Sequence, residues 1–145
     1  MNTLLIFIWI YAAMVATSFW EAYVEGRNAW DKGKLGWKIQ IGNFKLTGYH
    51  FFLFYVMWPL LITLPLVVHG WDTRLFGILL SAFFSGSVLE DFMWYVVNPV
   101  VKLRELNTDF ANYYPRIRFG AIRIPLFYFI GIGLAFLSWF LFWRI

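Results

Sequence analysis

The chain has 145 residues, of which 61% are hydrophobic, 23% aromatic and only 14% charged. Soluble domains average about 45–50% apolar and about 25% charged residues. A chain of this length has a large surface relative to its core, and 12 basic and 8 acidic residues cannot cover that surface. The composition therefore argues against a soluble globular domain and against a disordered chain. It predicts an integral membrane protein, folded as a single domain over residues 1–145.

Four apolar stretches are long enough to cross a bilayer as helices, which takes about 20 residues each. They run from about residue 3 to 20, 49 to 68, 75 to 97 and 125 to 143. The first stretch has no basic segment before it and exceeds the roughly 7–15 apolar residues of a signal peptide, so we interpret it as a span. The expected fold is an all-α bundle of four transmembrane helices.

The connections between these spans predict the orientation of the bundle. A short turn joins spans two and three, whereas long loops follow spans one and three, so both long loops lie at one end and both termini at the other. Basic residues gather in the long loops: Arg27, Lys32, Lys34, Lys38 and Lys45 in the first, and Lys102, Arg104, Arg116, Arg118 and Arg123 in the second. Only Arg74 and Arg144 lie at the opposite end.

The positive-inside rule then predicts a multi-pass protein of the cell membrane with cytoplasmic long loops and non-cytoplasmic termini. This distribution explains the net charge of +4 without a nucleic-acid partner. Residues 37–41 and 44–47 of the first loop alternate apolar and polar side chains around Gly42 and Asn43, which predicts a small β-hairpin.

Small residues recur at helical spacing in two of the spans. They are Gly77, Ser81 and Ser85 in the third span, and Gly131 and Ala135 in the fourth. Such stripes allow close helix packing in lipid. We expect this packing within the bundle rather than between copies, although a homo-oligomer or a larger membrane complex is the alternative.

Ionisable residues at membrane depth are the main functional candidates, because they are expensive there and usually serve a purpose. Glu21 ends the first span, and Glu25 lies one turn further on. His50 begins the second span, and Glu90 and Asp91 lie in the last third of the third. Since successive spans alternate in direction, all of these residues are expected at the loop end of the bundle.

This convergence predicts a divalent metal site, because no span contains a Lys or Arg that would neutralise the acids. We expect Glu21, His50, Glu90 and Asp91 as ligands, and carboxylate plus imidazole favours Fe, Mn or Zn over Mg or Ca. The corresponding function is a metal-dependent enzyme acting on a lipid or apolar small molecule at the cytoplasmic leaflet. Glu25 or Asn98 would act as general base or outer-shell group. The expected substrate-binding crevice is lined by Trp94, Tyr95, Trp20 and Phe51.

Other functions fit the same residues. The acids could form a metal-free acid–base or ligand-binding crevice for an amphiphile, or belong to an accessory subunit or an oligomeric ion pathway. Glu21 and Glu25 could also pair with loop cations such as Arg27, Lys32 or Arg116. The sequence has no His-Glu-x-x-His pattern, no Gly-x-Ser-x-Gly pattern and no phosphate-binding glycine loop, so no known motif fixes a reaction.

Overall fold

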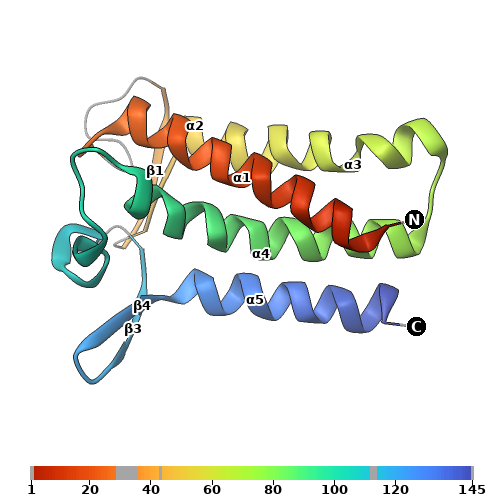
Figure 1. The fold of residues 1–145 in the computed structure, drawn as a ribbon. Helices are drawn as coiled ribbons and strands as arrows, with labels where there is room; N and C mark the ends of the chain where they lie inside the picture. The colour runs from red at the N-terminus through yellow and green to blue at the C-terminus, as the bar shows by residue number, and fades with distance from the viewer. Residues whose placement is uncertain (1, 29–35, 43, 112–113, 145) are drawn as a thin grey trace.

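The structure is a computed structural model that describes residues 2–28, 36–42, 44–111 and 114–144. Its described part contains four helical segments long and apolar enough to cross a membrane: Thr3–Glu25, Gly48–His69, Thr73–Val97 and Leu126–Trp143. The segments run side by side, with both termini at one end and two β-hairpins at the other (Figure 1). This is the predicted arrangement of spans and loops. Lys32, Lys34 and Asn43, which entered the sequence predictions, lie outside the described residues.

The first helix is longer than predicted. Helix α1 covers Thr3–Glu25, begins with an Asn2 side chain that caps the Leu5 amide, and ends at Gly26 with a φ of 56°. The predicted span ends at about residue 20, just before the first charged side chain, whereas the helix itself continues to Glu25. The side chains of Glu21 and of Glu25, the last residue of the helix, are both buried inside the bundle.

The second segment is composite. It consists of α2 (Gly48–His50), a π-helical stretch (Phe51–Met57) and α3 (Trp58–His69). Helix α4 (Thr73–Val97) is one regular helix whose first turn is capped by the Asp72 side chain. Helix α5 (Leu126–Ser138) continues as a second π-helical stretch (Trp139–Trp143).

Two antiparallel hairpins accompany the four helical segments. Strands β1 (Lys38–Ile41) and β2 (Phe44–Thr47) form the hairpin that the alternating pattern predicts. Strands β3 (Arg116–Phe119) and β4 (Ile122–Pro125) form a second hairpin that was not predicted. Two 3-10 turns, Leu103–Asn107 and Asp109–Ala111, lie between α4 and β3.

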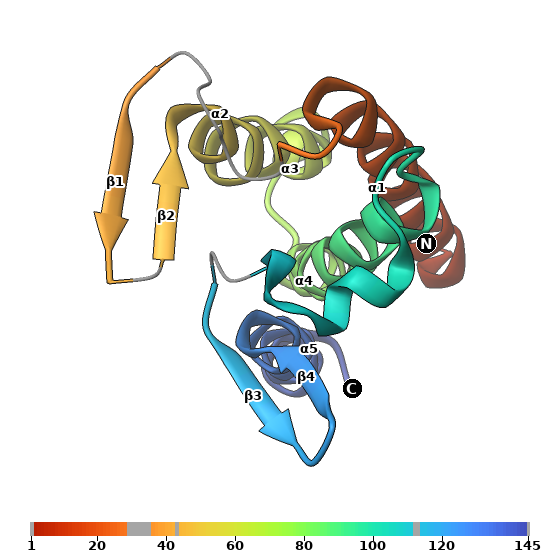
Figure 2. The same cartoon turned by 90° about the vertical axis from the view of Figure 1, so that its left-hand side faces the viewer.

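Helix α4 is the central element, in contact with α1, α3 and α5 (Figure 2). Its small residues allow the close approach: a Cβ added at Gly86 would meet Met14 Cγ of α1 at 3.1 Å. Ser81 Oγ donates to the Ala135 carbonyl and Ser138 Oγ to the Gly77 carbonyl, each at 2.9 Å. The small-residue stripes therefore pack within the bundle.

The outer face of the bundle is apolar. Large side chains such as Trp9, Val67 and Phe136 are exposed there, while Met14 and Ile78 are completely buried between helices. Exposed apolar surface all along spanning-length helices is compatible with a multi-pass membrane protein, in which lipid covers that surface.

Candidate metal centre

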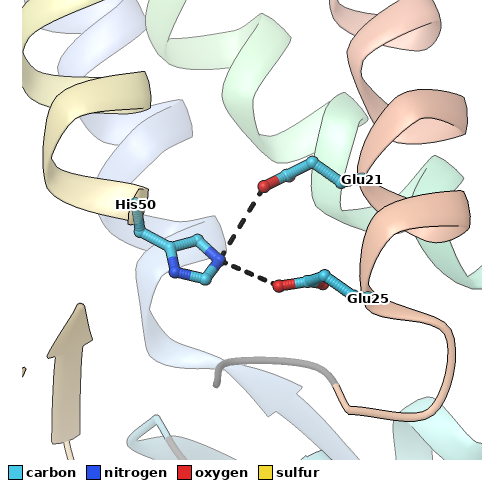
Figure 3. Close-up of side chains that lie close together, drawn as sticks. All are labelled: Glu21, Glu25 and His50. Atoms are coloured by element: carbon cyan, nitrogen blue, oxygen red, sulfur yellow. Dashed lines mark ion pairs between the residues drawn. The ribbon is translucent and has the colours of Figure 1, made fainter. Parts of the chain in front are cut away.

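Glu21, Glu25 and His50 meet at the loop end of the bundle (Figure 3). The two glutamates lie one turn apart on α1, and both carboxyl groups point at the imidazole of His50, which closes α2. His50 Nε2 lies 3.3 Å from Glu25 Oε1 and 3.8 Å from Glu21 Oε1. The three residues are 3–7% exposed, so the group is shielded from the surroundings.

The orientation of His50 is set by Thr47, the residue that precedes α2. Thr47 Oγ1 accepts a hydrogen bond from the His50 main-chain amide at 3.3 Å and lies 2.6 Å from His50 Nδ1. The ring is also packed edge to face against Tyr49 and parallel to Phe54. These contacts fix Nδ1 toward Thr47 and leave Nε2 facing α1.

The end of α1 is tied to the end of α4 by Asn98. Asn98 Nδ2 donates to the Gly26 carbonyl at 3.0 Å, while Oδ1 accepts from the amides of Val100 and Val101 at 2.9 Å each. The sequence singled out Asn98 as a general base or outer-shell group. In the structure its amide group serves the main chain and positions the last turn of α1, which carries Glu25.

Arg27 does not pair with the acids of the cluster. Its guanidinium holds both Glu105 carboxylate oxygens, at 3.1 and 2.7 Å, and the Val100 carbonyl at 2.9 Å. The Arg27 contacts thus add a second link between the end of α1 and the segment after α4. Glu25 Oε1 instead lies 3.3 Å from His50 Nε2.

Glu90 and Asp91 face different neighbours, as adjacent residues separated by about 100° around a helix must. Glu90 is 4% exposed and lies within electrostatic reach of Glu21 and Glu25. Asp91 turns toward α5, where its Oδ2 accepts a hydrogen bond from the Tyr128 hydroxyl at 2.7 Å. Of the four predicted metal ligands, Glu21 and His50 meet directly, Glu90 lies beside them, and Asp91 is held by Tyr128.

Several buried polar atoms next to the cluster have no hydrogen-bond partner among the described residues. They are Glu21 Oε1, Glu90 Oε1 and the Tyr49 hydroxyl. A buried polar atom without a partner costs about 1–3 kcal/mol, and more when it is charged. The Glu90 carboxyl and the Tyr49 hydroxyl both lie within interaction distance of the Glu21 carboxyl.

The four predicted substrate-binding aromatics do not form one surface. Trp94 and Tyr95 are buried in an apolar cluster with Ala22, and the Tyr95 hydroxyl lies 3.2 Å from that of Tyr114. Trp20 is 48% exposed and packs on Tyr49. Phe51 instead packs on Trp37 of the first loop. The structure therefore places these side chains in three separate surroundings.

Sequence reasoning missed two residues that shape this end of the bundle. Thr47 was considered only as the end of the predicted hairpin, although a Thr just before a helix is a known capping signal. Tyr128 carried no signal, because its partner Asp91 lies on another helix.

Comparison with protein-family models, curated proteins and solved structures finds no match for this chain.

Proposed function

We propose that this chain is an integral membrane metalloprotein that binds one divalent ion through Glu21, Glu25 and His50, with Glu90 as a further ligand. The observation that carries the proposal is the buried group itself. Each of the three residues offers one ligand atom, and these atoms lie within 4.8 Å of one another. Glu25, which the sequence suggested as a general base, becomes a ligand in this proposal.

The distances between the candidate ligand atoms support an ion of about the size of zinc. Zinc-like ions bind nitrogen and oxygen ligands at about 2.0–2.2 Å, which places neighbouring ligand atoms about 3.3 Å apart in a tetrahedral site. The separations of 3.3 and 3.8 Å from His50 Nε2 to the two carboxylates are close to that spacing. Because the three ligand atoms lie within 4.8 Å of one another, the carboxylates would have to move inward for all three atoms to bind one ion.

The negative charge of the buried carboxylates also supports a bound cation. A carboxylate removed from water needs a positive partner or a proton. A divalent ion would neutralise the negative charge of the Glu21, Glu25 and Glu90 carboxylates and give the buried oxygens of Glu21 and Glu90 a ligand bond.

The donor set indicates the class of metal and of reaction. Carboxylate oxygens with one imidazole favour Fe, Mn or Zn over Mg or Ca. If Glu21, Glu25 and His50 alone held the ion, a coordination position would remain for water, and the chemistry supplied would be activation of that water as a nucleophile. At the membrane depth proposed here, the substrate class is a lipid or another apolar molecule reaching the cytoplasmic end of the bundle.

A metal-free function is the second candidate, and the distance of 3.3 Å between His50 Nε2 and Glu25 Oε1 favours it. That distance suits a hydrogen-bonded ion pair without any ion. In this case Glu25 and His50 exchange a proton with a bound amphiphile. Activity that survives removal of metal by a chelator supports this candidate over the first.

The test is metal binding by the purified protein after stripping with a chelator. We expect Zn²⁺ or Mn²⁺ to bind at one ion per chain, and we expect Glu21→Gln, Glu25→Gln and His50→Gln each to weaken binding by about tenfold or more. The matched controls are His69→Gln, the other histidine, which is exposed at the opposite end of the bundle, and Glu105→Gln. The proposal fails if the wild type binds no stoichiometric metal, or if the controls weaken binding as much as the site variants.

A further inference from the structure

The β3–β4 hairpin has one apolar face and one basic face. Successive residues of a strand point to opposite faces, and residues paired across two strands share a face. The cross-strand pairs Ile117–Ile124 and Phe119–Ile122 therefore make one face entirely apolar. The opposite face consists of Arg116, Arg118, Arg123 and Pro125.

The β1–β2 hairpin repeats this division. Its apolar face is formed by the cross-strand pairs Ile39–Leu46 and Ile41–Phe44. The opposite face is polar and consists of Lys38, Gln40, Lys45 and Thr47. Each hairpin leads directly into a spanning segment, since β2 precedes α2 and β4 precedes α5. The same pattern in the same place in both halves of the chain indicates a common role.

The basic face of the β3–β4 hairpin is turned toward the two 3-10 turns that follow α4. Arg116 Nη1 donates to the Thr108 carbonyl at 2.8 Å, and Arg123 forms an ion pair with Asp109. The Arg123 amide also donates to Asn107 Oδ1 at 2.6 Å. Because the 3-10 turns contact the basic side, the apolar face points away from them.

The apolar face of this hairpin is exposed and continues the outer surface of α5. Phe119 and Ile122 are 56% and 58% exposed. The Phe119 ring lies 6.1 Å from the ring of Phe129, centre to centre, and Phe129 and Ile130 are themselves exposed at the start of α5. A surface that is continuous with the outside of a spanning helix shares its surroundings, which in a membrane are lipid.

The first hairpin meets its spanning segment in a similar way. Trp37, which directly precedes β1, has its ring 5.4 Å from that of Phe51. The Phe51 ring in turn stacks on exposed Tyr55 at 6.0 Å. Trp and Tyr side chains are enriched at the boundary between the apolar core and the headgroups. Both hairpins therefore begin or end at the level of that boundary.

The orientation of the hairpins also suits a membrane surface. In Figure 2 the helices are seen nearly end on, whereas both hairpins are seen along their length, and the β3–β4 hairpin reaches sideways beyond α5. The hairpins thus lie mostly across the direction of the helices. In a membrane that the helices cross, they lie along its surface.

The charges of the hairpins indicate which lipids they meet. The four strands contain Lys38, Lys45, Arg116, Arg118 and Arg123 and no acidic residue. Arg118 lies directly across from Arg123, and like charges in this position repel each other. Asp109 pairs with Arg123, while Arg118 Nε donates to the neutral Gly120 carbonyl at 3.0 Å. An anionic headgroup is the complementary partner for such a surface.

We propose that the two hairpins are amphipathic anchors that lie in the headgroup layer and bind anionic lipid. Their apolar faces enter the edge of the hydrocarbon core, and their basic side chains stay at the level of the phosphates. The inference rests on the spanning arrangement in the proposed function but does not require the metal ion. It assigns the exposed apolar faces to lipid rather than to a second protein.

The depth of each face is measured with nitroxide labels, because the chain has no cysteine and one can be introduced at a chosen position. Phe119→Cys and Arg118→Cys label adjacent residues on opposite faces, as do Ile41→Cys and Gln40→Cys. Phe136→Cys on the outside of α5 and Arg104→Cys in the first 3-10 turn are the lipid and water references. The metal-free protein is placed in phosphatidylcholine vesicles with about one third phosphatidylglycerol.

Oxygen concentrates in the bilayer, whereas a nickel chelate stays in water, so the ratio of their collision rates with the label reports depth. We expect this ratio to be at least about threefold higher at position 119 than at 118, and at 41 than at 40. The ratios at 119 and 41 should lie closer to that of the Phe136 label than to that of the Arg104 label.

The preference for anionic lipid is measured with spin-labelled phosphatidylglycerol and phosphatidylcholine on the unlabelled protein. We expect the wild type to prefer phosphatidylglycerol by about twofold or more at low salt. Combining Lys38→Gln, Lys45→Gln and Arg118→Gln should remove this preference. The matched control combines Lys38→Arg, Lys45→Arg and Arg118→Lys, which keeps every charge and should keep the preference. Thermal unfolding checks that both variants are folded.

Three results would overturn the inference. They are equal depth ratios on the two faces of a hairpin, a label at 119 shielded from both reagents, as a protein partner would shield it, and equal lipid preference in the two triple variants. A water-exposed label at 136 would contradict the spanning arrangement as well. A lipid-exposed label at 136 with a water-exposed label at 119 overturns the anchors alone, and metal binding on the same preparations tests the metal centre separately.

Discussion

Thr47 Oγ1 lies 2.6 Å from His50 Nδ1, and the same oxygen accepts a hydrogen bond from the His50 main-chain amide. The Thr47 hydroxyl thus caps the N-terminus of α2 and also orients the imidazole of His50. When Nδ1 carries the ring proton and donates it to Thr47, Nε2 has its lone pair directed at Glu21 and Glu25. A second hydrogen bond of this kind is the usual support of a metal-binding histidine.

Replacing Thr47 should therefore affect metal binding more than stability. Thr47→Val keeps the shape of the side chain and removes the oxygen, so we expect metal affinity to fall by about 10- to 100-fold. The lost cap should lower the free energy of unfolding by about 0.5–2 kcal/mol. Thr47→Ser keeps the hydroxyl and serves as the control for both measurements. Unchanged metal affinity in Thr47→Val would show that the hydroxyl does not support a ligand.

The contact between α4 and α5 gives a prediction about packing. A Cβ at Gly131 would meet Val88 Cγ2 at 2.7 Å and the Phe84 carbonyl oxygen at 3.1 Å, whereas a Cβ at Gly133 would meet nothing within 4 Å. Gly131→Ala should therefore lower the free energy of unfolding by about 1–3 kcal/mol. Gly133→Ala, two residues along the same helix, should be neutral or stabilising by up to about 1 kcal/mol. Thermal unfolding in detergent compares the pair, and similar effects of the two substitutions would argue against this α4–α5 interface.

The link between Arg27 and Glu105 gives a prediction about pH. Hydrogen bonds from the Arg27 guanidinium hold the pKa of the Glu105 carboxyl below its ordinary value of 4.5. Because the pKa is lower in the folded state, the stabilising contribution is complete above the unfolded pKa and is lost as the pH falls through the folded one. Glu105→Gln should thus lower the melting temperature at neutral pH, with a difference from wild type that narrows below about pH 4.5. A difference that stays constant from about pH 3 to 7 would contradict this role of the ion pair.

Much of the fold could be predicted from hydrophobicity alone, because a spanning helix needs a long apolar run whatever its neighbours are. The end of α1 could not be predicted in this way. Charged residues such as Glu21 and Glu25 resemble the end of a membrane span until it is known that their side chains point into the bundle. The β3–β4 hairpin was missed although Arg116, Arg118 and Arg123 alternate with apolar residues. Apolar neighbours and a loop rich in arginine suggested headgroup contacts rather than strands.

The sequence could predict which end of the bundle carries these residues but not how they group: it placed Asp91 among the ligands and Glu25 outside them, whereas the structure brings Glu21, Glu25 and His50 together. Alternating span direction was enough to bring Glu21, Glu25, His50 and Glu90 to one end of the bundle. The separate surroundings of Glu90 and Asp91 depend on which neighbouring helix each one faces, and a single sequence does not contain this information. The same is true of the partner of Asp91, the Tyr128 hydroxyl, which lies 37 residues away in the chain.

The central claim is that a divalent ion lies between Glu21, Glu25 and His50. It is tested most directly by anomalous X-ray diffraction from crystals of the protein loaded with Zn²⁺ or Mn²⁺, recorded at the absorption edge of the metal. We predict one strong anomalous peak per chain within bonding distance, about 2.0–2.2 Å, of His50 Nε2 and of at least one oxygen each from Glu21 and Glu25. A map without a peak at this position, or with metal bound only at exposed residues such as His69, would contradict the account.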